Sequence, residues 1–451
     1  MINRTAWEES SGLPVKELMA SWTEQMGFPL IRVTDESWED DHVTLKIEQS
    51  WFLLDGGALS EEEDKKKWTI PLITCTEAGY QEDIIFIREK TATVVIPLKS
   101  KSDWVKLNAG QEVVLRVLPT DTMIERLSDA IKKKTLSVCD RGGLVTDAYA
   151  LVKAGHMKPE TLIKLLSSYI DEDSYIVWQG LADALTGLHT VLQEDEEICK
   201  KLVRFARKLV LKLVSISGWD SKEDDGHLTV LLRGTAMSLA SLFCYEEEDI
   251  VTEARKRFEA FMSNPDDASV LPSDMKSPVF GIVLKSGGQN EFDTVKRYFY
   301  TAKDQAERKY VLGTLGMIQD AKLKEQTLEW AISGDVKLQD FFYPMGSVGY
   351  SSKKGKEIAW SFFQTHFEKI RSMIGKGSPS LMDACIVNCA GGFCSSEKAD
   401  EIDHFFQVHP LPQNARKIAQ TTEGMRANAK FFQRLQSSEL SSQSFWDSVV
   451  E

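Results

Sequence analysis

The chain has 451 residues, of which 42% are hydrophobic and 27% are charged, and its formal net charge is −14. This length allows two or three domains with substantial cores. A negative balance opposes binding to a phosphate backbone, so we expect no nucleic-acid partner. No apolar run reaches the roughly 18 residues that a membrane helix needs, so we expect no membrane span.

The seven cysteines are scattered, and the N-terminus has no apolar segment of the kind found in a secretory signal. An odd cysteine count without CxxC pairs is typical of free thiols in a reducing compartment. We therefore expect a cytoplasmic protein.

Residues 1–27 predict a terminal helical segment. Its apolar stripe consists of residues at helical spacing, which are Val15, Leu18, Met19 and Trp22. Gly27 suits a left-handed helix cap, and Pro29 cannot continue the helix. Because so few residues precede this helix, we expect its stripe to have no packing partner within the chain.

Residues 28–118 change to a two-residue period. The segment 42–47 alternates polar and apolar side chains, as a half-buried strand does. Further strands are predicted at 68–74, 84–87, 93–96, 104–107 and 113–117. Turn residues at short spacing favour a sandwich over a parallel sheet.

Helical periodicity begins after Pro119 and continues to the C-terminus. The predicted helices lie at 121–134, 140–154, 159–170, 174–193, 196–216, 226–244, 247–263, 291–302, 304–317, 321–333, 354–374, 397–408 and 411–436. Short connections indicate stacked antiparallel pairs. The predicted fold is mainly α with a small all-β domain: a terminal helix (1–27), a β-sandwich (28–118) and a HEAT/armadillo-like α-solenoid (119–451).

Known catalytic motifs are absent from the sequence. A zinc peptidase of the HExxH type needs two histidines one helical turn apart, and no two of the seven histidines are spaced that way. There is also no GxSxG elbow and no glycine-rich phosphate loop. Cys385 and Cys389 share a helical face near Cys394, but without a fourth ligand we expect buried, inert thiols. We predict no catalytic residue and no metal ligand in this chain.

The most distinctive cluster joins a loop to a helix. It contains Gly-Trp-Asp at 218–220, Gly-His-Leu at 226–228 and Leu-Leu-Arg at 231–233. Asp224 or Asp225 is expected to cap the helix, with His227 and Arg233 on its first turns. Arg233 is a candidate to meet a peptide carboxylate, because its planar fork suits that group. The alternative, which we favour, is an ion pair inside the helical array.

These segments resemble the C-terminal half of zinc aminopeptidases of the puromycin-sensitive type. The resemblance begins with Ser-Gly-Leu-Pro-Val at 11–15 and Ser-Trp-Thr-Glu-Gln-Met-Gly-Phe-Pro at 21–29, which match the end of that family's catalytic domain. It continues through Asp-Arg-Gly-Gly-Leu at 140–144, the 218–233 cluster, and matches near 254–258, 271–274, 359–362 and 405–416. In the 140–144 segment we expect Asp140 to cap a helix and Arg141 to tie it to the sandwich.

One stretch departs from the family pattern. Where the family has Gly-Phe-Tyr-Arg-Val at the end of the sandwich, residues 113–117 read Val-Val-Leu-Arg-Val, so only Arg116 and Val117 remain. In the family this edge lies near the catalytic domain. The resemblance makes Arg116, His227 and Arg233 our candidates for the substrate chamber.

The resemblance implies a non-catalytic region that encloses the substrate chamber and helps to select peptides for removal of the amino-terminal residue. Peptide substrates and a catalytic metallopeptidase domain, on the same or a separate polypeptide, are the implied partners. It implies no cofactor in this chain, with zinc only in that catalytic domain. The alternative is a free-standing α-solenoid scaffold that binds a peptide or protein without enzymatic activity.

Overall fold

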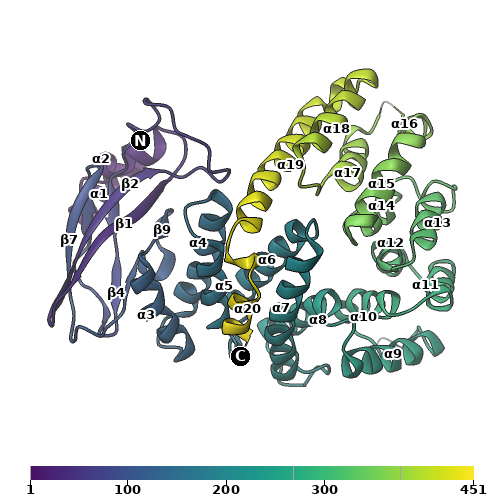
Figure 1. Ribbon diagram of the computed structural model, residues 1–451, viewed down its shortest axis with the longest axis horizontal. Helices are drawn as coiled ribbons and strands as arrows, with labels where there is room; N and C mark the ends of the chain where they lie inside the picture. Colours follow the sequence, from purple (N-terminus) through teal and green to yellow (C-terminus); the bar gives the residue numbers. More distant parts are fainter. Residues whose placement is uncertain (1, 268, 376, 451) are drawn as a thin grey trace. The chain divides into compact units, whose positions relative to one another are not determined.

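The structure is a computed structural model that describes residues 2–267, 269–375 and 377–450 (Figure 1). The chain divides into two compact units, residues 1–184 and 185–451. The described strands all lie in the first unit, and regular structure after residue 118 is helical. The predicted fold class, mainly α with a small all-β domain, is confirmed.

The strands of the first unit form three sheets. Their bounds are β1 Pro29–Trp38, β2 His42–Trp51, β3 Ile70–Leu72, β4 Thr74–Thr76, β5 Gly79–Tyr80, β6 Ile85–Ile87, β7 Thr91–Pro97, β8 Val105–Leu107 and β9 Arg116–Leu118. The largest sheet has the order β7-β2-β1-β9, antiparallel except that β9 runs parallel to β1. The smaller sheets are β3-β6 and β5-β4-β8.

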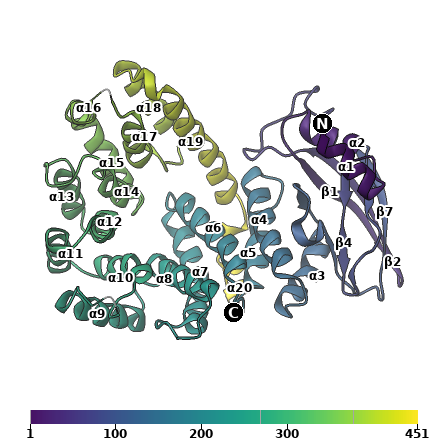
Figure 2. The same cartoon turned by 180° about the vertical axis from the view of Figure 1, so that it is seen from behind.

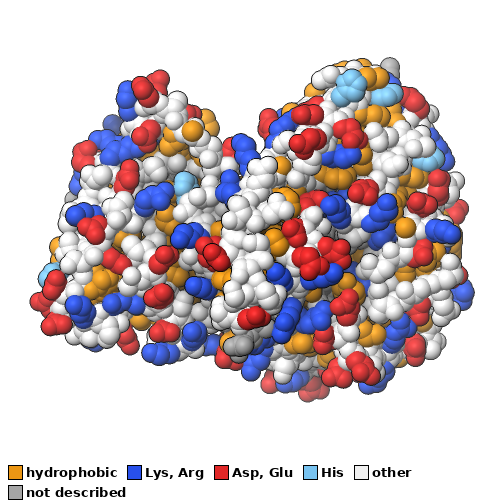
Figure 3. Space-filling model, viewed as in Figure 1, with side chains coloured by type: hydrophobic (Ala, Val, Ile, Leu, Met, Phe, Trp, Pro, Cys, Tyr) orange, Lys and Arg blue, Asp and Glu red, His pale blue; other side chains and the backbone are white. Residues whose placement is uncertain are grey.

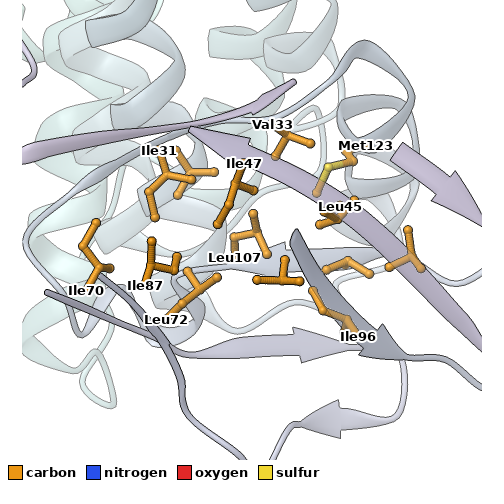
Figure 4. Packing of buried hydrophobic residues seen from close by; sticks show 14 of the residues in the cluster. Ile31, Val33, Leu45, Ile47, Ile70, Leu72, Ile87, Ile96, Leu107 and Met123 are labelled. Atoms are coloured by element: carbon orange, nitrogen blue, oxygen red, sulfur yellow. The ribbon is translucent and has the colours of Figure 1, made fainter. Parts of the chain in front are cut away.

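Alternating apolar side chains of these sheets meet in one core (Figure 4). Leu45 and Ile47 point inward from β2, whose buried and exposed residues alternate as its sequence predicted. Ile70, Leu72 and Leu107 come from the shorter strands, and Met123 of α3 (Asp121–Lys132) joins them. The sandwich is thus closed in part by the first helix that follows it.

The N-terminal residues form two helices, α1 (Ile2–Ser11) and α2 (Val15–Thr23), beside the sheets (Figure 2). The Trp22 indole packs against the sandwich core, and its Nε1 donates to the Thr69 carbonyl at 2.9 Å. The Thr69 N–H in turn donates to Ser21 Oγ at 3.0 Å. The expectation that this stripe has no partner within the chain is therefore wrong. The partner is distant in sequence, so local periodicity did not reveal it.

Gly27 does not cap α2, which ends at Thr23 with Glu24 as its C-cap. Gly27 instead has a φ of 94° and forms the turn into β1. A Cβ at this position would lie 1.9 Å from Nε1 of Trp51. Both the positive φ and the close indole require glycine here.

We expect Trp22→Ala to lower the free energy of unfolding by about 1–2 kcal/mol, because the half-buried indole loses its packing and its hydrogen bond. Urea denaturation followed by circular dichroism measures the change. Trp7→Ala is the matched control, since Trp7 is mostly exposed on α1. Equal effects of the two substitutions would contradict the packing of α2 on the sandwich.

The helices after α3 extend from the first unit through the second. Their bounds are α4 Val138–Ala154, α5 Pro159–Ser167, α6 Tyr175–Leu192, α7 Glu196–Ser217, α8 His227–Phe243, α9 Glu248–Ser263, α10 Ser273–Lys285, α11 Gln289–Thr301, α12 Gln305–Thr314, α13 Ala321–Ala331, α14 Phe342–Gly349, α15 Lys353–Thr365, α16 Phe367–Ile374, α17 Pro379–Ala390, α18 Ser396–Val408, α19 Ala415–Gln436 and α20 Gln443–Val450. Short 3-10 turns lie at Ala109–Gln111, Leu315–Met317, Pro412–Asn414 and Glu439–Ser441.

Two differences from the predicted helices have local causes. The helix predicted at 354–374 is broken at His366 into α15 and α16. No helix was predicted at α10, α14, α17 or α20, and α10 contains Pro278 and is buried along most of its length. A helix that is apolar on all sides has no stripe, so periodicity cannot identify it.

In the second unit, successive helices pack side by side in a curved array (Figure 1). One row runs α7, α8, α10, α12, α14, α17 and α19. The C-terminal helix α20 then packs on α7, where the Trp446 and Phe205 rings meet edge to face with centroids 6.0 Å apart. This arrangement brings residues from both ends of the unit together.

Among the described residues, no single helix is long and apolar enough to cross a membrane. The pair α8 and α9 meets the length and composition together, but across a bend of 116°. Both helices contribute side chains to the protein interior, such as Phe243 and Phe261.

Candidate functional site

Arg233, the first substrate-chamber candidate, is only 1% exposed on α8. Its Nη2 donates to Asp225 Oδ2 at 2.6 Å, and its Nε donates to the Ser217 carbonyl at the end of α7 at 3.2 Å. A third bond runs from Nη1 to Ser221 Oγ at 3.3 Å. The guanidinium therefore holds the 218–226 loop against two helices. A role for Arg233 in substrate contact stays a prediction.

The start of α8 differs from the expected capping. Gly226 is the N-cap, without a side-chain hydrogen bond, and Asp225 pairs with Arg233 instead. The pKa of Asp225 is lowered, first by the backbone N–H of Lys222 and then by Arg233. His227, the second candidate, is exposed at the first position of α8.

Arg116, the third candidate, joins β9 to α4. Its Nη1 donates to Asp147 Oδ1 at 2.8 Å, and the other carboxylate oxygen accepts from the Val117 N–H at 3.2 Å. Asp147 is buried, so this ion pair lies inside the first unit. The residue retained from the family pattern thus has a clear role in attaching the sandwich to the helices.

The roles expected for Asp140 and Arg141 are wrong. Ser137 is the N-cap of α4, and Asp140 accepts from the Gly110 N–H of the sandwich at 2.8 Å. Arg141 forms a two-bond ion pair with Glu172, beyond α5, at 2.7 and 3.1 Å. Consecutive helical side chains point about 100° apart, so only one of the two reaches the sandwich.

The residues described do not fit a catalytic zinc site. Within residues 2–267, 269–375 and 377–450, no group of three or more His, Cys, Asp or Glu side chains is placed to hold a metal ion. Cys385, Cys389 and Cys394 are buried free thiols, and burial raises the pKa of each. Their reactivity as thiolates is correspondingly low.

A basic pocket of about 750 Å³ in the second unit was not identified from the sequence. Its lining combines the turn between α6 and α7, the end of α10 and the start of α15. Lys353 Nζ lies 3.2 Å and Lys356 Nζ 3.5 Å from the Glu194 carboxylate. These residues are about 160 positions apart in sequence, and the curvature of the array brings them together. The only local signal was the run Ser-Ser-Lys-Lys-Gly-Lys at 351–356.

Lys285 lines this pocket, and the buried Lys324 donates from its Nζ to Ser351 Oγ of the lining. Burial lowers the pKa of Lys285 to about 8, and burial together with Lys285 lowers that of Lys324 to about 7. Burial, then Lys285 and Lys356, also lowers the pKa of His189 to about 4. Burial is the main cause of these lowered pKa values, and repulsion between neighbouring positive charges adds to it for Lys324 and His189.

We expect the stability contributed by Lys324 to rise between pH 7 and pH 9. Its pKa is about 7 when folded and near 10.5 when unfolded, so the unfolded chain binds the extra proton in this range. Urea unfolding at pH 7, 8 and 9 should show a steeper rise with pH for the unmodified chain than for Lys324→Met. The exposed Lys322, two residues away, is the control, and Lys322→Met should keep the original slope. Equal slopes for all three proteins would contradict the lowered pKa.

Acidic and basic side chains alternate over the face shown in Figure 3, without a large area of one sign. The lysine and arginine side chains that line the pocket are therefore a local feature of the second unit.

The sequence defines a C-terminal domain type that is named after an aminopeptidase-like family. The chain belongs to the family described as the ERAP1-like C-terminal domain, whose model matches residues 104–427. The resemblance inferred from the sequence is thereby confirmed.

Similar proteins cover nearly the whole chain. It is 27% identical to aminopeptidase M1-B of Oryza sativa subsp. japonica and 29% identical to the alanine/arginine aminopeptidase of Saccharomyces cerevisiae, with 95% of this chain aligned in each case. It is 26% identical to the puromycin-sensitive aminopeptidase of Caenorhabditis elegans, again with 95% of this chain aligned. These alignments cover 49%, 48% and 45% of the relatives, so the chain spans about half their length.

Proposed function

We propose that the chain serves as the non-catalytic C-terminal region of an aminopeptidase, where it encloses the substrate chamber and helps to select peptides. The observation that carries this proposal is the family match over residues 104–427, combined with relatives that are named aminopeptidases and are about twice as long. The curved helical array supports it, because such arrays present extended concave surfaces.

The proposed partners are peptide substrates and a catalytic metallopeptidase domain on the same or another polypeptide. Zinc would belong to that domain, as the resemblance to zinc aminopeptidases of the puromycin-sensitive type implies. The exposed apolar side chains Trp7, Leu13 and Met26 near α1 and α2 support a contact surface at this end of the chain.

Among the chamber candidates, we propose different roles. His227 is exposed at the start of α8 and is free to meet a peptide. Arg233 and Arg116 are held in ion pairs, so we propose that they position the 218–226 loop and β9. A cytoplasmic location is supported by the free state of all seven cysteines.

The test is hydrolysis of aminoacyl fluorogenic substrates by the purified 451-residue chain, with and without added zinc. We expect no hydrolysis and no stoichiometric bound zinc. The yeast alanine/arginine aminopeptidase under the same conditions is the positive control. Zinc-dependent hydrolysis by the chain alone, lost on chelation, would overturn the proposal.

A further inference from the structure

Strand β7 (Thr91–Pro97) is the outer strand of the largest sheet, whose order is β7-β2-β1-β9. It lies at the rim of the sandwich in both views (Figures 1 and 2). On one side, β7 pairs with β2 in an antiparallel ladder along its whole length. Its other side is an edge of the described sheet, and backbone groups at such an edge can bond to a further strand.

The ladder with β2 fixes which backbone groups of β7 face this edge. At one end of the ladder, the Gln49 N–H donates to the Lys90 carbonyl at 2.8 Å. At the other end, the Leu98 N–H donates to the Asp41 carbonyl at 2.8 Å. Along an antiparallel strand, backbone groups point alternately toward and away from the neighbouring strand. The even-numbered residues of β7 therefore bond to β2, and the odd-numbered residues present their backbone groups to the open edge.

The side chains of β7 do not protect this edge. Val94 and Ile96 are buried in the core, whereas the odd-numbered residues are exposed, with Val95 at 55%. Edge strands are usually shielded by charged side chains, by a proline within the strand or by a bulge. The strand Thr-Ala-Thr-Val-Val-Ile-Pro contains no charged residue, its pairing with β2 has no register shift, and its one proline, Pro97, is at its end. The open edge is thus suited to strand pairing.

Two copies of β7 fit together at this edge around a two-fold axis. An antiparallel pair centred on Val94 places Thr93 of one copy opposite Val95 of the other, and both residues can exchange backbone hydrogen bonds across the edge. Their β-branched side chains also meet on the solvent face, where such cross-strand pairs are favourable. Thr91 then faces Pro97, whose carbonyl can accept from the Thr91 N–H.

The same register brings opposite charges together beyond the ends of the strand. Glu89 precedes β7 and Lys99 follows it, each at five residues from Val94. A pair centred on Val94 therefore sets Glu89 of each copy opposite Lys99 of the other. The Glu89 side chain is 73% exposed and contacts Lys67 through one carboxylate oxygen, at 2.7 Å. A carboxylate accepts at both oxygens, so this contact does not prevent a second one.

We propose that a second copy of this chain pairs with β7 along its open edge, with the two antiparallel strands centred on Val94. The pairing joins two four-stranded sheets into one continuous sheet. Because the paired edge is short, the dimer is expected to be weak, with a dissociation constant of roughly 10 µM. Self-association at this edge would hold whether or not the chain closes a peptide chamber.

Sedimentation velocity of the full 451-residue chain tests this pairing. We expect a shift from monomer to dimer between about 1 and 200 µM. Val95→Lys should abolish the shift, because it places two lysines beside the two-fold axis and a charge opposes edge pairing. Val114→Lys is the matched control, since Val114 is a valine 69% exposed in the same unit outside β7, and it should associate as the unmodified chain does. Circular dichroism checks that both variants are folded.

Two further variants test the register and the identity of the partner. Glu89→Lys and Lys99→Glu each set like charges opposite one another in a dimer, so each variant alone should associate roughly fivefold more weakly. An equal mixture of the two variants restores opposite charges at both ends of the paired strands. The mixture should therefore associate about as tightly as the unmodified chain.

A chain that stays monomeric at every concentration would overturn the proposal. If that monomer binds a synthetic peptide of residues 88–100, the edge accepts a free strand and not a second copy, which also contradicts it. A dimer that persists in Val95→Lys would place the interface elsewhere. A mixture of Glu89→Lys and Lys99→Glu that associates no more tightly than either variant alone would contradict the pairing centred on Val94.

Discussion

Glu172→Ala should lower the free energy of unfolding by about 3–5 kcal/mol, because it breaks a buried ion pair in the first unit. Glu172 is 1% exposed and accepts two hydrogen bonds from the buried Arg141 guanidinium. It also accepts from the N–H groups of Asp173 and Ser174 ahead of α6. The alanine variant leaves a buried guanidinium without its opposite charge, because Arg141 then retains only its bond to the Leu136 carbonyl.

Asp173→Ala is the matched control at the adjacent position. Asp173 pairs with Lys134 at 2.7 Å, but its side chain is 56% exposed, and such pairs contribute less than about 1 kcal/mol. Urea denaturation followed by circular dichroism measures both variants. A small effect for Glu172→Ala, similar to that of its neighbour, would show that the Arg141–Glu172 pair does not hold α4 to the segment before α6.

Arg233→Met should lower the free energy of unfolding by about 2–4 kcal/mol. Methionine retains much of the apolar stem, but the Ser217 carbonyl and the Asp225 carboxylate lose their charged donor. The 218–226 loop should then exchange its amide hydrogens faster, because its anchor to α7 and α8 is gone. Hydrogen exchange followed by mass spectrometry reports this directly.

His227→Ala is the control on the same helix. The ring is exposed at the N-terminus of α8, so its removal should change stability by less than about 0.5 kcal/mol. Unchanged stability and unchanged amide exchange of the loop in Arg233→Met would contradict the positioning role proposed for Arg233.

The periodicity of the sequence was sufficient to predict the sandwich and most helices, because each depends on local alternation of apolar residues. β2 and α7 are clear examples, with their buried side chains at two-residue and helical spacing. α10 was missed because it is apolar on most sides, and the partner of Trp22 was missed because Thr69 is remote in sequence. These contacts depend on tertiary packing.

The candidate site was less predictable for the same reason. Arg233 was correctly associated with an internal carboxylate as the favoured alternative, since Asp225 lies only eight residues away. The basic pocket brings together Glu194 of the turn between α6 and α7, Lys285 of α10 and Lys353 of α15. No spacing rule connects such positions, and only the curvature of the array places them together.

The proposed function requires that this chain closes a peptide chamber in an aminopeptidase. The most direct measurement replaces the corresponding half of the Saccharomyces cerevisiae alanine/arginine aminopeptidase with this chain and compares cleavage rates for peptides of increasing length. We expect the chimera to remove amino-terminal residues and to discriminate by peptide length, whereas the catalytic half alone should not discriminate. A folded chimera whose length profile equals that of the catalytic half alone would contradict the claim.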